Sequence, residues 1–116
     1  MITLADIELQ EKDVLAFTCG YEVHLIAFSK IIRLEADGSY TRMFTVGSVY
    51  TFSRHIGFIE EKYFKERAEF LRARDSAIIN LSHVSSYANG ICIMTDGSAI
   101  QVARRRKAEL KQTLIA

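Results

Sequence analysis

Short runs of β-branched and aromatic residues recur along the chain, and glycine-containing turns separate them. Several runs alternate with a period of two, so that Val23, Leu25 and Ala27 would share one face of a strand. Strands spaced this closely predict an antiparallel all-β meander. The predicted strands are Val14–Thr18, Glu22–Phe28, Ile31–Glu35, Tyr40–Thr45, Ser48–Phe52, Glu69–Ala73, Ser76–Asn80, Val84–Tyr87, Gly90–Thr95 and Ala99–Val102.

Two segments have helical spacing instead. In Ser53–Lys65 the apolar positions fall on one helical stripe, which consists of Ile56, Ile59, Tyr63 and Phe64. The hydroxyl of Ser53 is a candidate cap for the first turn, because it can accept from a free backbone N–H. In the second segment, Arg104–Leu114, Leu110 and Leu114 lie one turn apart. The predicted fold class is therefore mainly β, with about ten short strands in small antiparallel sheets and one or two short helices.

The chain of 116 residues fits a single domain whose charge is distributed unevenly. Five acidic residues against one lysine give residues 1–22 a net charge of −4, whereas residues 101–116 carry +4. The total of +1 argues only weakly against nucleic acid, since the distribution of charge matters more than its sum. The chain has neither a membrane-length apolar run nor the basic start of a signal peptide, so we expect a cytoplasmic protein without a membrane partner.

Side chains that could carry out catalysis or bind metal are scattered. His24, His55 and His83 fall in different predicted elements, and none belongs to a nucleophile, metal or phosphate-loop motif. Cys19 and Cys92 are far apart and outside any CxxC pattern, so we expect two reduced thiols, with a disulfide switch as the alternative. The sequence therefore predicts no enzyme activity, no cofactor and no metal site.

Arginines gather at the ends of two predicted elements. The run Arg104–Lys107 is either the solvated first turn of a helix or a site for an anion, because a helix start disfavours cations unless an anion is near. Alternation places Arg72 and Arg74 on one face, with Ser76 in phase if the strand is unbroken. Asn80 ends that segment, and we expect its side chain to bond nearby backbone.

Three motifs in this order resemble the LytTR family of bacterial DNA-binding domains. They are the strand and turn of Ile31–Tyr40, the segment Arg72–Asn80, and the stretch from Asp96-Gly97 through the basic run to Leu110. Each motif is weak alone, but their common order and spacing are specific. The resemblance covers nearly the whole chain, which divides into a short extension, residues 1–12, and a LytTR-like domain, residues 13–116.

The resemblance implies a sequence-specific transcription regulator that places loops in successive major grooves of double-stranded DNA, often at repeated sites. By position, Thr41, Asp75 and Arg104 would contact bases. The residues expected to contact the DNA backbone are Arg42, His55, Arg72, Arg74, Ser76 and Arg105. The family pattern includes no cofactor.

This chain departs from the pattern at Asp75, where members usually carry Arg, Lys or Asn. A carboxylate there can accept from cytosine N4 in the major groove, or it can pair with Arg72 or Arg74 and weaken the basic patch. Ala103 also replaces the usual serine. About a dozen residues precede the first matching strand, so we expect a free-standing regulator.

The alternative function is a protein-interaction or dimerisation module on the same scaffold, with weak or no DNA binding. Its support is the near-neutral total charge, Asp75 and the acidic first residues. Residues 1–13 could pair with the basic edge of a second copy and form a homodimer.

Overall fold

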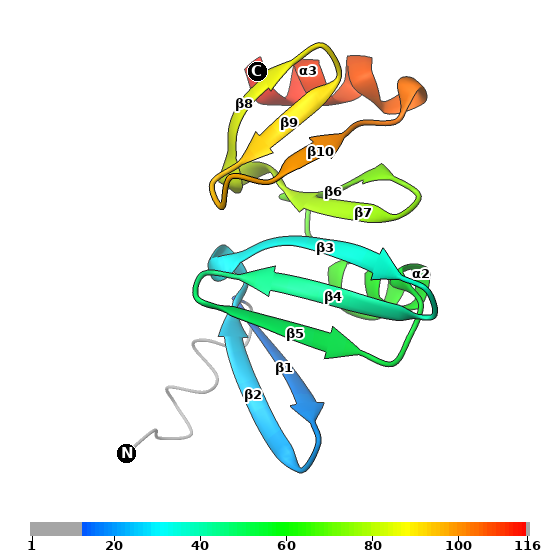
Figure 1. The fold of residues 1–116 in the computed structure, drawn as a ribbon. Helices are drawn as coiled ribbons and strands as arrows, with labels where there is room; N and C mark the ends of the chain where they lie inside the picture. Colours follow the sequence, from blue (N-terminus) through cyan, green and yellow to red (C-terminus); the bar gives the residue numbers. More distant parts are fainter. Residues whose placement is uncertain (1–12, 116) are drawn as a thin grey trace.

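The computed structural model describes residues 13–115, which form ten strands in three antiparallel sheets together with short helices (Figure 1). The mainly β fold class and the number of strands are confirmed. The strands are β1 (Val14–Cys19), β2 (Glu22–Ala27), β3 (Ile31–Asp37), β4 (Tyr40–Thr45), β5 (Ser48–Phe52), β6 (Phe70–Arg74), β7 (Ala77–Asn80), β8 (Val84–Ala88), β9 (Ile91–Met94) and β10 (Ala99–Gln101).

The sheets differ in size and are not one continuous meander. β1 and β2 form a hairpin, β8, β9 and β10 form a three-stranded sheet, and the five-stranded sheet has the order β5-β4-β3-β7-β6. The predicted meander is wrong because β7 returns to pair with β3, so that Leu34 lies opposite Ile78. All four residues of β7 are buried, and a strand buried on both faces needs a neighbour along each edge.

The adjacent isoleucines of β7 contribute to two different cores. Ile78 belongs to the core beneath the hairpin and the first helix, which also contains Leu34 and Phe17. Ile79 belongs to the core shared with the three-stranded sheet and the C-terminal helix, which also contains Leu110. This division follows from the strand geometry, because successive side chains point to opposite faces. The central sheet therefore links both ends of the molecule (Figure 1).

Both predicted helices are present, with changes at their starts. The first is α2 (Ile56–Ile59), which continues as the π-helical turn η2 (Glu60–Phe64), and its predicted apolar stripe faces the core. The predicted Ser53 cap is wrong, since the cap position is His55 and no side chain caps it. The second begins as a 3₁₀ turn, η4 (Arg104–Arg106), and continues as α3 (Lys107–Ile115).

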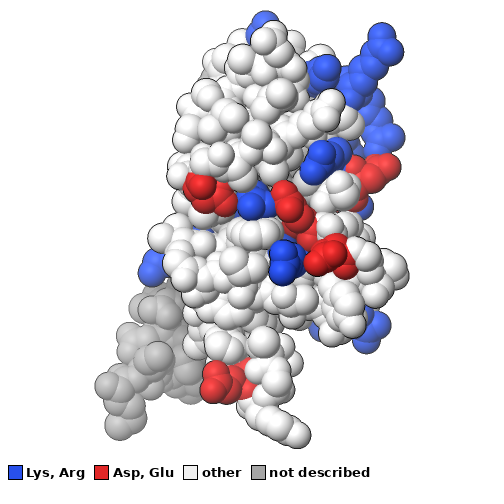
Figure 2. Space-filling model, in the orientation of Figure 1, with Lys and Arg blue, Asp and Glu red and all other residues white. Residues whose placement is uncertain are grey.

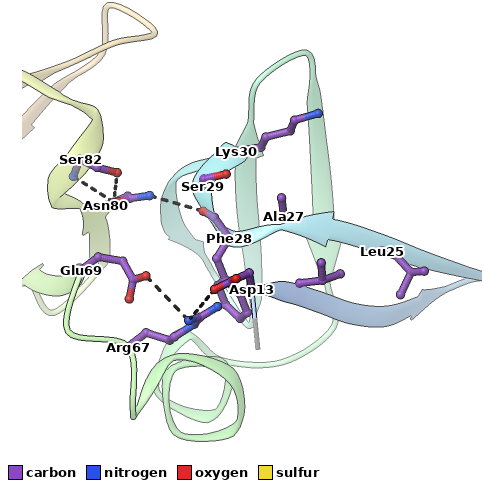
Figure 3. A pocket seen from close by; sticks show the side chains of 11 residues that line it. Asp13, Leu25, Ala27, Phe28, Ser29, Lys30, Arg67, Glu69, Asn80 and Ser82 are labelled. Carbon is purple, nitrogen blue, oxygen red and sulfur yellow. Dashed lines mark hydrogen bonds and ion pairs between the residues drawn. The ribbon is translucent and has the colours of Figure 1, made fainter. Parts of the chain in front are cut away.

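Two further 3₁₀ turns, η1 (Phe28–Lys30) and η3 (Leu81–His83), are joined by Asn80. The buried Asn80 amide donates to the Ile31 carbonyl at 2.9 Å. Its oxygen accepts from the Ser82 backbone N–H at 3.0 Å (Figure 3). The expectation that Asn80 bonds nearby backbone is confirmed. Its side chain also bonds backbone that is distant in sequence, so it fixes β3 to the end of β7.

A charged contact joins the five-stranded and three-stranded sheets. Arg33, which is 8% exposed, donates through Nε to Asp96 at 3.1 Å, and its Nη1 lies 2.6 Å from Glu35 Oε1. The guanidinium carbon lies 3.7 Å from the centre of the Phe44 ring. Acidic and basic side chains alternate across this face of the molecule (Figure 2). Arg33 therefore joins β3 to the β9–β10 turn through an ion pair, although these elements are far apart in sequence.

Replacing Asp96 with asparagine should reduce the loss in the free energy of unfolding that accompanies a fall in pH. Burial acts to raise the pKa of Asp96, but hydrogen bonds from Ser98 and Arg33, with the Arg33 charge, outweigh it and lower the pKa. A lowered folded-state pKa stabilises the protein above the unfolded value of about 3.9, and this contribution disappears as the pH falls through the folded value. Urea unfolding between about pH 6 and about pH 3 should therefore show a shallower loss in Asp96→Asn than in the parent. Equal slopes would contradict this role.

Both cysteines are free: Cys19 is exposed near the tip of the hairpin, and Cys92 is buried. Burial raises the pKa of the Cys92 thiol, so this thiol is the less reactive of the two. Within residues 13–115, no helix is long and apolar enough to span a membrane.

Candidate nucleic-acid interface

Three connections that carry the predicted contacts lie along one edge of the molecule. They are the β3–β4 turn, the β6–β7 turn and the connection from β10 to η4, all at the right in Figure 1. Backbone hydrogen bonds join them: Ala36 N–H donates to the Ser76 carbonyl at 2.9 Å, and Ala103 N–H donates to the Ala73 carbonyl at 2.8 Å. Segments separated by tens of residues in the sequence thus form one continuous surface, which we call the loop edge.

The β6–β7 turn takes its shape from Arg72. A register shift between Arg72 and Arg74 interrupts the pairing of β6 with β7, and the turn follows it. Nε and Nη2 of Arg72 both donate to the Asp75 carbonyl, at 3.1 and 2.6 Å, while Nη1 donates to Glu60 at 2.8 Å. Ser76 lies in the turn, so the strand is broken and the condition under which Ser76 would be in phase with the arginines is not met.

The carboxylate of Asp75 has a different partner. Arg105 Nη2 donates to Asp75 Oδ1 at 2.9 Å, and the two side chains are 68% and 89% exposed, respectively. The sequence-based alternative paired Asp75 with Arg72 or Arg74, but Arg72 contacts the Asp75 carbonyl and Arg105 contacts the carboxylate. This exposed ion pair places one negative charge at the centre of the loop edge.

Arg104, Arg74 and Lys107 differ from these paired arginines. Among the residues that the structure describes, none of the three has a carboxylate within ion-pair distance. Arg104 and Lys107 are exposed, at the start of η4 and α3, respectively. Figure 2 shows basic side chains projecting at the upper right, on the same side as the loop edge.

The contacts predicted near β4 have different degrees of exposure. Thr41 is 0% exposed, and its hydroxyl donates to the Arg54 carbonyl at 2.7 Å, so its side chain is enclosed rather than available to a base. Arg42 is exposed and lies 3.6 Å from Asp37 Oδ2. His55 is exposed at the start of α2. Thr41 thus fixes the loop that carries Arg54 and His55, which joins this loop to the edge.

Sequence reasoning missed a basic-aromatic cluster beside that loop. The Arg54 guanidinium carbon lies 4.7 Å from the centre of the Phe58 ring, and Lys62 Nζ lies 5.8 Å from the same ring. Phe58 is itself exposed. The signal was present as a spacing of four residues between Arg54, Phe58 and Lys62, which brings side chains together on a helix.

A hollow of about 740 Å³ is lined by other elements. It lies between the β1–β2 hairpin and the segment that leads into β6, and Arg67 stacks over Phe28 there (Figure 3). None of the nine predicted contact residues lines it. Within residues 13–115, no group of three or more His, Cys, Asp or Glu side chains is placed to hold a metal ion.

Comparisons with known proteins identify the family and agree with the fold. The family model for the LytTr DNA-binding domain matches residues 21–115. Among solved structures, the chain is similar to the LytTr DNA-binding domain of a methyl-accepting/DNA response regulator from Bacillus cereus. The two share 20% identity at a TM-score of 0.69, over 88% of this chain and 96% of the other. A search of curated proteins finds no match. Since the family model covers most of its length, the chain belongs to the LytTr DNA-binding domain family, whose role is transcription regulation.

Proposed function

We propose that the protein is a sequence-specific regulator that inserts the connections of the loop edge into successive major grooves of double-stranded DNA at repeated sites in the cytoplasm. The observation that carries the proposal is the joining of three loops by the Ala36–Ser76 and Ala103–Ala73 hydrogen bonds. A surface assembled this way presents its side chains in fixed relative positions, which reading a base sequence requires. Proteins that recognise DNA use backbone contacts for register and base-edge contacts for specificity.

Arg104 and Asp75 are the proposed base contacts. Arg104 is exposed and has no carboxylate partner within residues 13–115, so its planar guanidinium is free to bind guanine in a bidentate manner. Asp75 can accept from cytosine N4 once Arg105 turns to a phosphate. Thr41 is left out of the proposed contacts, because its side chain is enclosed.

The proposed backbone contacts fall into two groups. Arg72 fixes the β6–β7 turn, which contains Ser76, and Arg72 would reach a phosphate only by giving up a present partner. The members of the second group are exposed or partly exposed, and Arg42 and Arg105 would exchange an exposed carboxylate partner for a phosphate. This group consists of Arg42, His55, Arg74 and Arg105.

Replacing Asp75 with asparagine should narrow the difference in affinity between a selected duplex and a random one. Loss of the carboxylate frees Arg105 and removes repulsion of phosphates, so random duplexes should bind roughly 2- to 5-fold tighter. Loss of the cytosine acceptor should at the same time cost about 1–3 kcal/mol of discrimination at one base pair. Fluorescence anisotropy with both duplexes measures the two effects.

Asp37→Asn is the matched control for this experiment. It removes a second exposed carboxylate of the loop edge, which lies beside Arg42. Both variants should strengthen binding to random duplexes, but only Asp75→Asn should reduce discrimination. An unchanged specificity ratio in Asp75→Asn would remove Asp75 from the base contacts.

Chemical-shift mapping with a labelled protein and a 20-base-pair duplex tests the whole surface at once. We expect the largest amide shifts at residues 36–42, 73–76 and 103–107, with little change in the β1–β2 hairpin. Shifts concentrated in the hairpin, or none at about 50 mM salt, would contradict the proposal.

A homodimerisation module remains the second candidate, and one observation favours it. The hairpin exposes Val23 and Leu25 by 69% and 53%, on the face turned away from the core. Apolar side chains at this density can mark a contact with another protein. The sequence-based version of this candidate pairs acidic residues 1–13 with the basic edge of a second copy. Of these residues, only Asp13 lies within the described part of the chain. Sedimentation equilibrium without DNA distinguishes the candidates, since an apolar dimer would persist at high salt.

A further inference from the structure

A hollow of about 360 Å³ lies on the loop edge between the end of β6 and the start of α3. Its walls contain three cationic side chains and no acidic one. The lining residues are Arg74, Gln101, Val102, Ala103, Arg104 and Lys107. The neighbouring arginines lie outside it, each already paired with a carboxylate: Arg72 with Glu60, and Arg105 with Asp75. Paired and unpaired cations are thus separated within a few residues.

Arg74, Arg104 and Lys107 place uncompensated positive charge around the hollow. Three positive charges around one hollow repel one another, and no carboxylate within residues 13–115 lies within ion-pair distance of any of them. Arg74 Nε is enclosed and has no hydrogen-bond partner there, which is costly for a charged donor. An anion in the hollow would relieve both costs, because it can accept from several donors at once.

The lysine of this group lies against a neighbouring turn. A Cβ atom added at Gly90, where φ is +76°, would lie 2.6 Å from Lys107 Cε and 2.9 Å from its Nζ. The ammonium group therefore rests against the backbone of the β8–β9 turn. A glycine there allows the backbone conformation and also leaves space for the lysine.

We propose that this hollow binds one phosphate of the DNA backbone, with Arg74 and Lys107 as its donors and Arg104 at its rim. The inference rests on the proposed function and adds Lys107 to its contacts. A backbone phosphate suits the site better than a base edge, since the lining side chains supply five-donor and three-donor cations but only the amide of Gln101 as an acceptor. Because Arg104 lies at the rim of the same hollow, a phosphate bound there would fix the distance between the Arg104 backbone and the major groove.

Lys107→Gln is the direct test, because glutamine removes the charge and keeps much of the stem. We expect affinity for selected and random duplexes to fall alike, by roughly 3- to 10-fold, and the slope of log K against log salt to fall by about 0.9. Lys111→Gln removes the same charge one turn further along α3, outside the hollow. It should leave the affinity within about twofold of the parent and the salt slope unchanged.

A duplex carrying single methylphosphonates identifies the phosphate. One neutral position should weaken the parent to the same extent as Lys107→Gln and have no further effect in that variant, since both remove the same contact. Inorganic phosphate, titrated at constant ionic strength, should shift the Lys107 signals only at millimolar concentrations. Micromolar binding of inorganic phosphate, unaffected by duplex, would instead mark a free-anion site and overturn the proposal.

Different results would contradict DNA binding by the protein and phosphate binding in this hollow. If no duplex binds the parent, the proposed function fails. If duplexes bind but Lys107→Gln behaves like Lys111→Gln, or every methylphosphonate is additive with it, this inference alone is overturned. Arg74→Gln provides a second variant, for which we expect the same neutral position to lose its effect.

Discussion

Replacing Arg104 with alanine should lower the affinity for a selected duplex by about 1–3 kcal/mol and relax the preference at one base pair. The reason is geometric: Arg104 is exposed at the start of η4, and Ala103, the residue before it, is hydrogen-bonded to β6. A guanidinium that starts from a fixed backbone position can bind the O6 and N7 atoms of guanine in a bidentate manner. Competition binding against duplexes with every substitution at each position measures the change.

Arg106→Ala is the matched control, because Arg106 occupies the same 3₁₀ turn and lies 3.4 Å from Glu109. It removes one positive charge without removing the proposed base contact. We expect a small, uniform loss across all sequences. If Arg104→Ala also weakened every duplex equally, Arg104 would be a phosphate contact and the base reader would lie elsewhere on the loop edge.

Arg33→Met should destabilise the fold by about 2–4 kcal/mol, the largest effect that we expect on stability. Methionine keeps an apolar stem against Phe44 but leaves Asp96 and Glu35 facing each other without their shared cation. Breaking a buried ion pair from one side leaves uncompensated charge, although the partial exposure of both acids reduces the cost here. Urea unfolding at neutral pH measures the loss.

Arg42→Met is the control for the Arg33–Asp96 ion pair. Arg42 is about half exposed and lies 3.6 Å from its carboxylate, so the variant should change stability by less than about 0.5 kcal/mol. Neutralising one partner as well, in Arg33→Met with Asp96→Asn, should recover part of the loss. Equal stabilities for the two single variants would show that Arg33 does not join the sheets.

Local pattern was sufficient to predict the strands but not their pairing. Alternation and glycine turns predicted every strand to within a few residues, because side-chain period and turn chemistry are local properties. The pairing of β3 with β7 spans about 40 residues and depends on the burial of Ile78 and Ile79 on opposite faces. The continuation of α2 into the π-helical turn η2 places Phe64 in the same core as Ile78.

The candidate site could be predicted only as a set of residue types. The motifs singled out Arg104, Asp75 and Arg105, but their sequence positions could not show that Asp75 would pair with Arg105, which lies 30 residues away. Nor did the pattern reveal that Thr41 is enclosed, since its hydroxyl bonds a loop that the fold brings alongside. The sequence identifies Lys107 only as one cation of a basic run. Its position beside Gly90 depends on the three-stranded sheet, whose β8–β9 turn contains that glycine.

Selection of bound duplexes from a random pool, followed by a salt titration on the selected sequence, tests the central claim most directly. We expect a spaced repeat with a strong guanine preference in each half, and a steep fall of affinity with salt that reflects several phosphate contacts. We also expect that the guanine preference disappears in a pool selected with Arg104→Ala. Recovery of no enriched sequence by the parent, with binding that is insensitive to salt, would contradict DNA recognition by the loop edge.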